Sequence, residues 1–176
     1  MKTIITFFLL FLLTITLSIL GNCGGNEPYE WYIRAQVKII TPTSEDNFSF
    51  YEPCHLFSSE IDQETYWEID AIKSKPPFGI YICWKESFIT GPGTFQIEEG
   101  FQTLFILLMR AHPTEPGWNR YSEVDEGSVT FTQIGYQSGD IIEGSFDQLY
   151  LYDWDAETHI EVDNGTFRCR VEKYSN

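Results

Sequence analysis

Short runs in which apolar and polar residues alternate dominate this sequence, and they constrain its fold more than any other feature. The clearest run is Tyr32–Ile40, in which every second residue from Ile33 onward is apolar. Successive side chains of a β-strand point to opposite faces of the sheet, so this pattern predicts a strand with one buried face. Pro42 and the polar residues beside it end the run.

Seven further runs complete the predicted fold. They are rich in β-branched and aromatic residues, are separated by Gly, Pro, Asn and Asp, and lie at Phe48–Tyr51, Thr65–Ile72, Phe78–Trp84, Thr103–Ala111, Ser128–Ile134, Ile141–Tyr152 and Thr166–Glu172. We therefore predict a mainly β protein, with a single antiparallel β-sandwich of about eight strands. The run at 103–111 is apolar on both faces, which is typical of a central strand, although a short buried helix fits the same periodicity.

The first 22 residues have the profile of an export signal. Lys2 supplies a positive charge, and Ile4–Leu20 contains no charged residue and consists mostly of Leu, Ile and Phe. This run approaches the roughly 20 apolar residues that span a bilayer, so an uncleaved membrane anchor is the alternative. The polar stretch Gly24–Pro28 has no basic cluster that would stop transfer, which favours cleavage.

This segment ends in the tetrapeptide Leu20-Gly21-Asn22-Cys23. The tetrapeptide resembles a lipobox, the site at which bacterial lipoprotein peptidases cut before an acylated cysteine, although Asn22 stands where Gly, Ala or Ser is usual. An ordinary secretory signal cut near Gly21 is the alternative reading of the same residues.

The resemblance implies that residues 1–22 are a cleaved lipoprotein signal peptide and that Cys23 is the lipid attachment site. Residues 23–28 would then form an acylated N-terminus with a flexible leader, and residues 29–176 a single β-sandwich domain. The implied location is a bacterial membrane, with the outer membrane preferred over the inner one. Each buried methylene of an acyl chain contributes about 0.8 kcal/mol, so the lipid suffices as the membrane contact.

The charge of the chain excludes one class of partner. Without its first 22 residues the chain has 154 residues, with 10 basic and 26 acidic side chains and a formal net charge of −16. This length suits one domain. Because the basic residues are dispersed singly among acids, we predict no nucleic-acid partner. An anionic bilayer would repel the domain, although such acidity also serves solubility.

Three cysteines follow Cys23, at positions 54, 83 and 169. An oxidising compartment permits one disulfide among Cys54, Cys83 and Cys169 and leaves one thiol, and the sequence does not fix which two pair. Their spacings of 29 and 86 residues, without a Cys-x-x-Cys motif or a nearby pair of histidines, argue against zinc.

Residues 127–132, 141–146 and 164–167, in the last third of the chain, contain the patterns G-x-V-x-F-T, I-x-G-x-F and N-G-x-F. These three segments resemble the closing strands of a broad group of small bacterial surface lipoproteins of unknown function. The resemblance covers roughly residues 127–172 and implies a β-sandwich. It carries over no functional residue, because that group has no agreed active site.

An acidic loop is the strongest metal candidate. Asp153, Asp155 and Glu157 alternate at loop spacing, and carboxylate oxygens are the ligands that Ca²⁺ prefers. The glycine of an EF-hand loop is missing, and an acidic connection between two strands explains the same residues. We therefore predict no cofactor, with calcium at these three residues as the alternative.

Two tryptophans are candidates for ligand stacking. Trp118 and Trp154 lie in predicted loops, where a flat ring with a polar tip suits a saccharide. We expect the other three tryptophans to belong to the core. The predicted partner is accordingly a saccharide or a protein.

The sequence contains no familiar catalytic motif, so we predict that the protein is not an enzyme. Cys54 and His55 are neighbours on a predicted strand and therefore point to opposite faces, which keeps them from forming a catalytic pair. A hydrolase of unfamiliar type is the alternative. It would use paired acids such as Glu143 and Asp147, which would have to lie about 5–9.5 Å apart.

The leading prediction is thus a lipid-anchored envelope protein whose β-domain has a binding or structural role. The second is a secreted eukaryotic domain, because Asn47-Phe48-Ser49 and Asn164-Gly165-Thr166 are glycosylation sequons and four cysteines permit two disulfides.

Overall fold

The computed structural model describes residues 29–97, 103–111, 119–153 and 157–172. Within these ranges the chain forms ten β-strands and no helix, so no helix there is long and apolar enough to cross a membrane. The strands are β1 (Tyr32–Ile40), β2 (Glu45–Ile61), β3 (Glu64–Ser74), β4 (Pro77–Lys85), β5 (Gly93–Gln96), β6 (Leu104–Ala111), β7 (Asn119–Glu123), β8 (Glu126–Gln133), β9 (Ile141–Asp153) and β10 (Thr158–Arg170).

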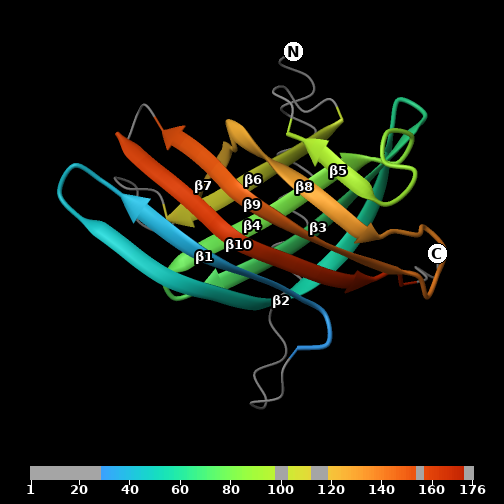
Figure 1. Ribbon diagram of the computed structural model, residues 1–176, viewed down its shortest axis with the longest axis horizontal. Helices are drawn as coiled ribbons and strands as arrows, with labels where there is room; N and C mark the ends of the chain where they lie inside the picture. The colour runs from blue at the N-terminus through green and yellow to red at the C-terminus, as the bar shows by residue number, and fades with distance from the viewer. Residues whose placement is uncertain (1–28, 98–102, 112–118, 154–156, 173–176) are drawn as a thin grey trace.

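All ten strands belong to one antiparallel sheet, which curls upon itself into a half-barrel (Figure 1). Their order across the sheet is β5-β8-β9-β10-β1-β2-β3-β4-β6-β7. The long strand β2 connects the two halves, because residues 45–53 pair with β1 and residues 54–61 pair with β3. Strands β8, β9 and β10 therefore lie across the interior from β3, β4 and β6 (Figure 1).

The connection between β7 and β8 ties the two halves together on the other side. The backbone N–H of Val124 donates to the carbonyl of Ile106 on β6, and the N–H of Asp125 donates to the carbonyl of Tyr150 on β9, each at 2.9 Å. The side chain of Val124 is fully buried. The half-barrel is thus fastened both at β2 and at this short connection.

The prediction of a mainly β protein is confirmed, and each of the eight predicted runs overlaps a strand of the structure. The eight-stranded sandwich is not confirmed, because ten strands form a single sheet. The two strands that were not predicted, β5 and β7, have only four and five residues, too few for alternation to stand out. The run at 103–111 is strand β6 and not a helix.

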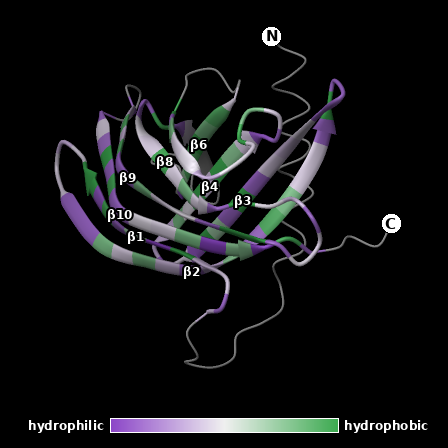
Figure 2. Cartoon of the chain, turned by 45° about the vertical axis from the view of Figure 1, so that its right-hand side comes forward, coloured by the Kyte–Doolittle hydropathy of each residue, from purple (hydrophilic) through white to green (hydrophobic). Residues whose placement is uncertain are grey.

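The interior holds the main hydrophobic core, to which both halves contribute. Alternate residues of β1 from Ile33 to Val37 are at most 3% exposed, as the sequence predicts. In the same core, the rings of Trp84 and Phe131 meet edge to face with centroids 5.2 Å apart, and Phe131 meets Phe167 in the same way at 5.5 Å. Hydrophobic and hydrophilic residues alternate along the strands (Figure 2).

A disulfide joins β2 to β10. It links Cys54 to Cys169, which are 115 residues apart in the sequence and have Cα atoms 6.6 Å apart. In the sheet, β1 separates these strands, and the bond lies beside the start of β1. Among the described cysteines this leaves Cys83 as a buried free thiol. The sequence did not fix which two of Cys54, Cys83 and Cys169 pair, and the structure pairs Cys54 with Cys169.

Two glycines in the C-terminal motifs make room for aromatic rings on the neighbouring strand. Gly144 on β9 faces Phe167 on β10, and Gly165 on β10 faces Phe146 on β9. The two rings stack nearly parallel, with centroids 6.4 Å apart. A Cβ atom at Gly165 would lie 1.9 Å from the ring of Phe146. The patterns I-x-G-x-F and N-G-x-F therefore encode a reciprocal packing of glycine against phenylalanine.

Replacing Gly165 with alanine is expected to lower the free energy of unfolding by about 1–3 kcal/mol, because the added methyl group overpacks the contact with Phe146. Urea denaturation of the variant measures this change. Gly91→Ala is the matched control, since a Cβ at Gly91 has no neighbouring atom within 4 Å. Equal stability of the two variants would contradict the proposed packing.

Candidate functional site

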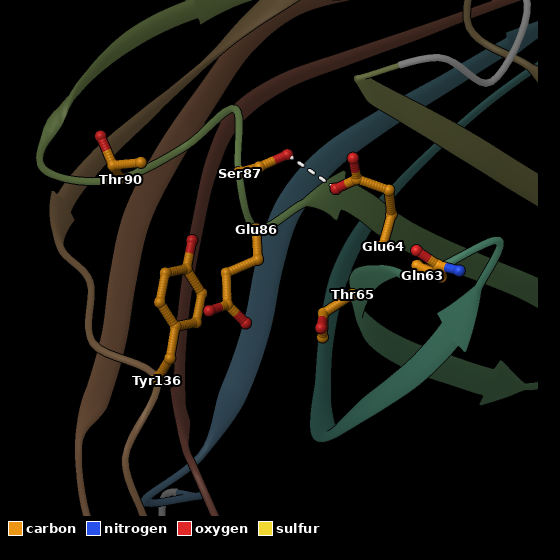
Figure 3. Close-up of a pocket in the computed structure, with 7 residues that line it drawn as sticks. All are labelled: Gln63, Glu64, Thr65, Glu86, Ser87, Thr90 and Tyr136. Carbon is orange, nitrogen blue, oxygen red and sulfur yellow. Dashed lines mark hydrogen bonds between the residues drawn. The ribbon is translucent and has the colours of Figure 1, made fainter.

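A hollow of about 320 Å³ lies where three connections between strands meet (Figure 3). These are the turn from β2 to β3, the connection from β4 to β5 and the connection from β8 to β9. The lining residues carry carboxylate, hydroxyl or amide groups and are Gln63, Glu64, Thr65, Glu86, Ser87, Thr90 and Tyr136. It is therefore a polar site that contains one aromatic side chain.

The turn from β2 to β3 sets the rim of this hollow. Asp62 and Gln63 both have positive φ, at 52° and 69°, and they connect the paired residues Ile61 and Glu64. Two left-handed residues in a two-residue hairpin match the twist of the strands, although Asn-Gly is the usual sequence there. The turn places Glu64 and the following Thr65 at the hollow.

Tyr136 is fixed in place from two sides. Its hydroxyl accepts a hydrogen bond from Trp84 Nε1 at 3.1 Å and donates one to the carbonyl of Ile89. Its ring lies against that of Trp67, with centroids 5.3 Å apart. Burial raises the pKa of Tyr136 to about 12, so the phenol keeps its proton at neutral pH. The result is a rigid aromatic wall.

Two carboxylates flank the wall. Trp67 Nε1 donates to Glu86 Oε2 at 2.8 Å, which orients that carboxylate. Lys85 Nζ lies 3.1 Å from Glu64 Oε1, and Ser87 Oγ donates to Glu64 Oε2 at 3.0 Å (Figure 3). The hydrogen bonds from Lys85 and then Ser87 lower the pKa of Glu64, which is therefore ionised at neutral pH. Such a site accepts hydrogen bonds from a ligand that carries several hydroxyl groups.

A second, larger hollow of about 690 Å³ is less suited to a ligand. Its carboxylates include Asp125 and Asp147. Asp125 Oδ2 accepts from the backbone N–H of Tyr152 at 2.7 Å, and Asp147 Oδ1 accepts from that of Asn164 at 3.0 Å. These two carboxylates therefore already accept hydrogen bonds from the backbone of β9 and β10.

The predicted calcium ligands are only partly described. Asp153 is buried and forms an ion pair with Arg110 across the interior. Glu157 is exposed, with φ of 47°, and Asp155 lies outside the described residues. Arg110 thus already supplies a positive charge to Asp153. In the part of the chain that the structure describes, no group of three His, Cys, Asp or Glu side chains is placed to hold a metal ion. Calcium stays a prediction.

Other predicted residues also lie outside the described ranges. They are Cys23, Trp118 and Trp154, so the lipid site and the stacking sites stay predictions. The aromatic wall of Tyr136 and Trp67 was not predicted. The two residues are 69 positions apart, and no local pattern links them.

The acids of the hydrolase alternative do not form a pair. Glu143 and Asp147 are four residues apart on β9, a separation of about 13 Å along a strand. That exceeds the 5–9.5 Å of a glycosidase pair. Glu143 lies 3.3 Å from Arg168, whereas Asp147 binds the backbone of Asn164.

Titratable groups gather on the outer face of the sheet, at β2, β3 and β4. Glu68 and Asp70 are 7% and 1% exposed, and Glu68 Oε1 and both carboxylate oxygens of Asp70 lack hydrogen-bond donors. Cys83 Sγ donates to Glu68 Oε2 at 3.6 Å. His55 Nδ1 lies 3.5 Å from Asp70 Oδ1, longer than a well-formed hydrogen bond. As predicted, His55 points away from the interior, where Cys54 forms its disulfide.

Burial, followed by the charge of Asp70, raises the pKa of Glu68 to about 7. The folded chain therefore holds this proton up to about pH 7, whereas the unfolded chain releases it near the ordinary value of 4.5. Below pH 4.5 the folded chain therefore has the full stabilisation that comes from holding this proton. This contribution to the free energy of unfolding, about 3 kcal/mol in total, is lost as the pH rises through 7.

Replacing Glu68 with glutamine is accordingly expected to raise the free energy of unfolding of the full chain at pH 8 by up to about 3 kcal/mol and to change it little at pH 4. Urea denaturation at the two pH values measures the difference. Glu60→Gln, at an exposed position of β2, is the control. An effect of Glu68→Gln that is the same at both pH values would refute the assignment.

Comparisons of the chain with protein-family models, with curated proteins and with solved structures found no match.

Proposed function

We propose that this protein is exported and lipid-anchored in a bacterial cell envelope, and that its β-domain binds a saccharide in the hollow beside Tyr136. The observation that carries the binding proposal is a fixed aromatic ring among carboxylates and hydroxyl groups in one hollow. The anchor rests on the tetrapeptide that ends in Cys23.

The chemistry of the hollow favours a neutral or amino sugar. The carbon-bound face of a sugar ring packs on an aromatic side chain, and its hydroxyl groups donate to carboxylates such as Glu86 and Glu64. The exposed hydroxyls of Ser87 and Thr90 add both donors and acceptors. The formal net charge of −15 disfavours an anionic ligand.

Binding to an array of neutral and amino-sugar oligosaccharides tests the saccharide proposal. The variants Ser87→Ala and Glu86→Gln are expected to weaken binding at least about tenfold, which corresponds to about 1.4 kcal/mol. Ser49→Ala is the matched control, because Ser49 is also exposed and also donates to a side-chain oxygen, that of Gln36 at 3.2 Å. Absence of binding, or unchanged binding by both hollow variants, would refute the proposal.

Intact mass of the protein recovered from a bacterial membrane tests the anchor. The expected product begins at Cys23 and carries added acyl mass, and Cys23→Ala releases the domain from the membrane fraction. The secreted eukaryotic alternative predicts instead hexosamine-bearing mass at Asn47 and Asn164, both of which are exposed in the structure.

A further inference from the structure

The two carboxylates of the hollow differ in how their charges are compensated. Glu64 Oε1 lies 3.1 Å from Lys85 Nζ, and Glu64 Oε2 accepts a hydrogen bond from Ser87 Oγ at 3.0 Å. Both oxygens of Glu64 therefore have donors, and one of these donors is a cation. A ligand in the hollow consequently meets little uncompensated negative charge at this carboxylate.

Glu86 has no cationic partner of this kind. Its Oε2 accepts from Trp67 Nε1 at 2.8 Å, and an indole N–H is a neutral donor. Among the residues that the structure describes, no cation pairs with Glu86 and no group donates to its Oε1. The side chain is half-buried, so its charge is screened less by water and salt than that of an exposed carboxylate.

The ring of Tyr136 lies beside this uncompensated carboxylate (Figure 3). Its hydroxyl cannot neutralise Glu86, because it donates its proton to the carbonyl of Ile89 and accepts from Trp84. Burial is the main cause of the raised pKa of Tyr136, and the charge of Glu86 adds to it, as expected for close neighbours. The face of an aromatic ring also attracts cations. A free negative charge and an aromatic ring thus occur together, and this combination suits an ammonium group.

We infer that the hollow selects saccharides that carry a free ammonium group and that Glu86 determines this selectivity. The selectivity rests on the proposed saccharide binding and distinguishes amino sugars from neutral ones. An ammonium group supplies Glu86 Oε1 with a charged donor, and such hydrogen bonds are about twice as strong as neutral ones. A neutral sugar in the same position would cover a charge that it cannot compensate.

The other lining residues suit the uncharged parts of a sugar. Gln63 and Thr90 are exposed and carry both donor and acceptor groups, so they can bind hydroxyl groups without adding charge. Acetylation of the amino group would remove the charge that complements Glu86. We therefore expect N-acetylated sugars to bind as weakly as neutral ones. The formal net charge of −15 also favours the approach of a cationic ligand.

Isothermal titration calorimetry of the full chain with two matched ligands tests this selectivity. The ligands are the glucosamine trimer, below the pKa of its amines, and cellotriose, which carries a hydroxyl group in place of each ammonium group. We expect the glucosamine trimer to bind at least about tenfold more tightly. The difference should narrow as salt is added, because salt screens the attraction between the ammonium group and Glu86.

Two variants should move this preference in opposite directions. Glu86→Gln retains an oxygen for the indole N–H but removes the charge, so the two ligands should then bind within about twofold of each other. Lys85→Met removes the cation that compensates Glu64, so the preference for the glucosamine trimer should increase. Glu45→Gln is the control and should leave the preference unchanged, because Glu45 is an exposed carboxylate 3.7 Å from Lys38 and does not line the hollow.

The outcomes separate this selectivity from saccharide binding itself. Equal affinity for the two ligands in the parent chain, or an undiminished preference in Glu86→Gln, would overturn the inference and leave saccharide binding intact. Absence of binding by both ligands would overturn the inference together with the saccharide proposal. Cadaverine, a diamine without a sugar ring, should bind at least about tenfold more weakly than the glucosamine trimer. Equally tight binding of cadaverine would show that the sugar is not recognised and would overturn both proposals.

Discussion

Replacing Arg110 with alanine is expected to lower the free energy of unfolding by about 3–5 kcal/mol. Arg110 on β6 is 8% exposed and its partner Asp153 on β9 is 4% exposed, and their ion pair joins the two halves of the half-barrel. Removing the guanidinium would take away the positive charge that Arg110 supplies to this buried carboxylate, which costs far more than the loss of a surface pair.

Urea denaturation of the full chain measures this effect. Lys38→Ala is the control, because Lys38 also pairs with carboxylates, at 3.7 Å and 3.8 Å, but on an exposed surface where such pairs contribute at most about 1 kcal/mol. The double variant Arg110→Met and Asp153→Leu should recover most of the loss, since it removes both charges together. If Arg110→Ala is as mild as Lys38→Ala, the ion pair is not a buried contact between the halves.

Loss of the disulfide is expected to be comparably severe, at about 4–5 kcal/mol. Cys54 and Cys169 are 115 residues apart in the sequence, and the entropy that a cross-link removes from the unfolded chain grows with the length of the loop it closes. The double variant Cys54→Ala and Cys169→Ala should therefore unfold at a much lower urea concentration than the parent chain.

Cys83→Ala distinguishes this effect from the general cost of replacing a buried cysteine. Cys83 is 3% exposed but forms no disulfide, so its replacement removes one small buried side chain together with its weak hydrogen bond to Glu68. We expect a loss of about 1 kcal/mol for that variant. Equal losses for Cys83→Ala and the double variant would show that the cross-link contributes little.

The hollow beside Tyr136 illustrates why the candidate site escaped prediction. Trp67 belongs to a predicted strand and, as expected, to the main core, and its ring also supports Tyr136 while its N–H orients Glu86. These three residues come from three separate parts of the chain. No spacing in the sequence relates these residues, because they come close together only when the sheet curls.

The sequence by itself determined the strands and their faces. Alternation with a period of two residues is a local property, so it correctly assigned β1, the inward side of Ile33, and the opposite orientations of Cys54 and His55. The glycines at 144 and 165 were visible as motifs, although their reason, the rings of the neighbouring strand, was not.

Only the tertiary structure decided how the strands combine. Strand β2 pairs on both sides over different halves of its length, which makes one curled sheet out of what the sequence suggests as two. The same curl of the sheet brings Cys169 next to Cys54 and Arg110 next to Asp153. Those choices depend on contacts between residues far apart in the chain, and a local pattern contains no information about which distant strands become neighbours.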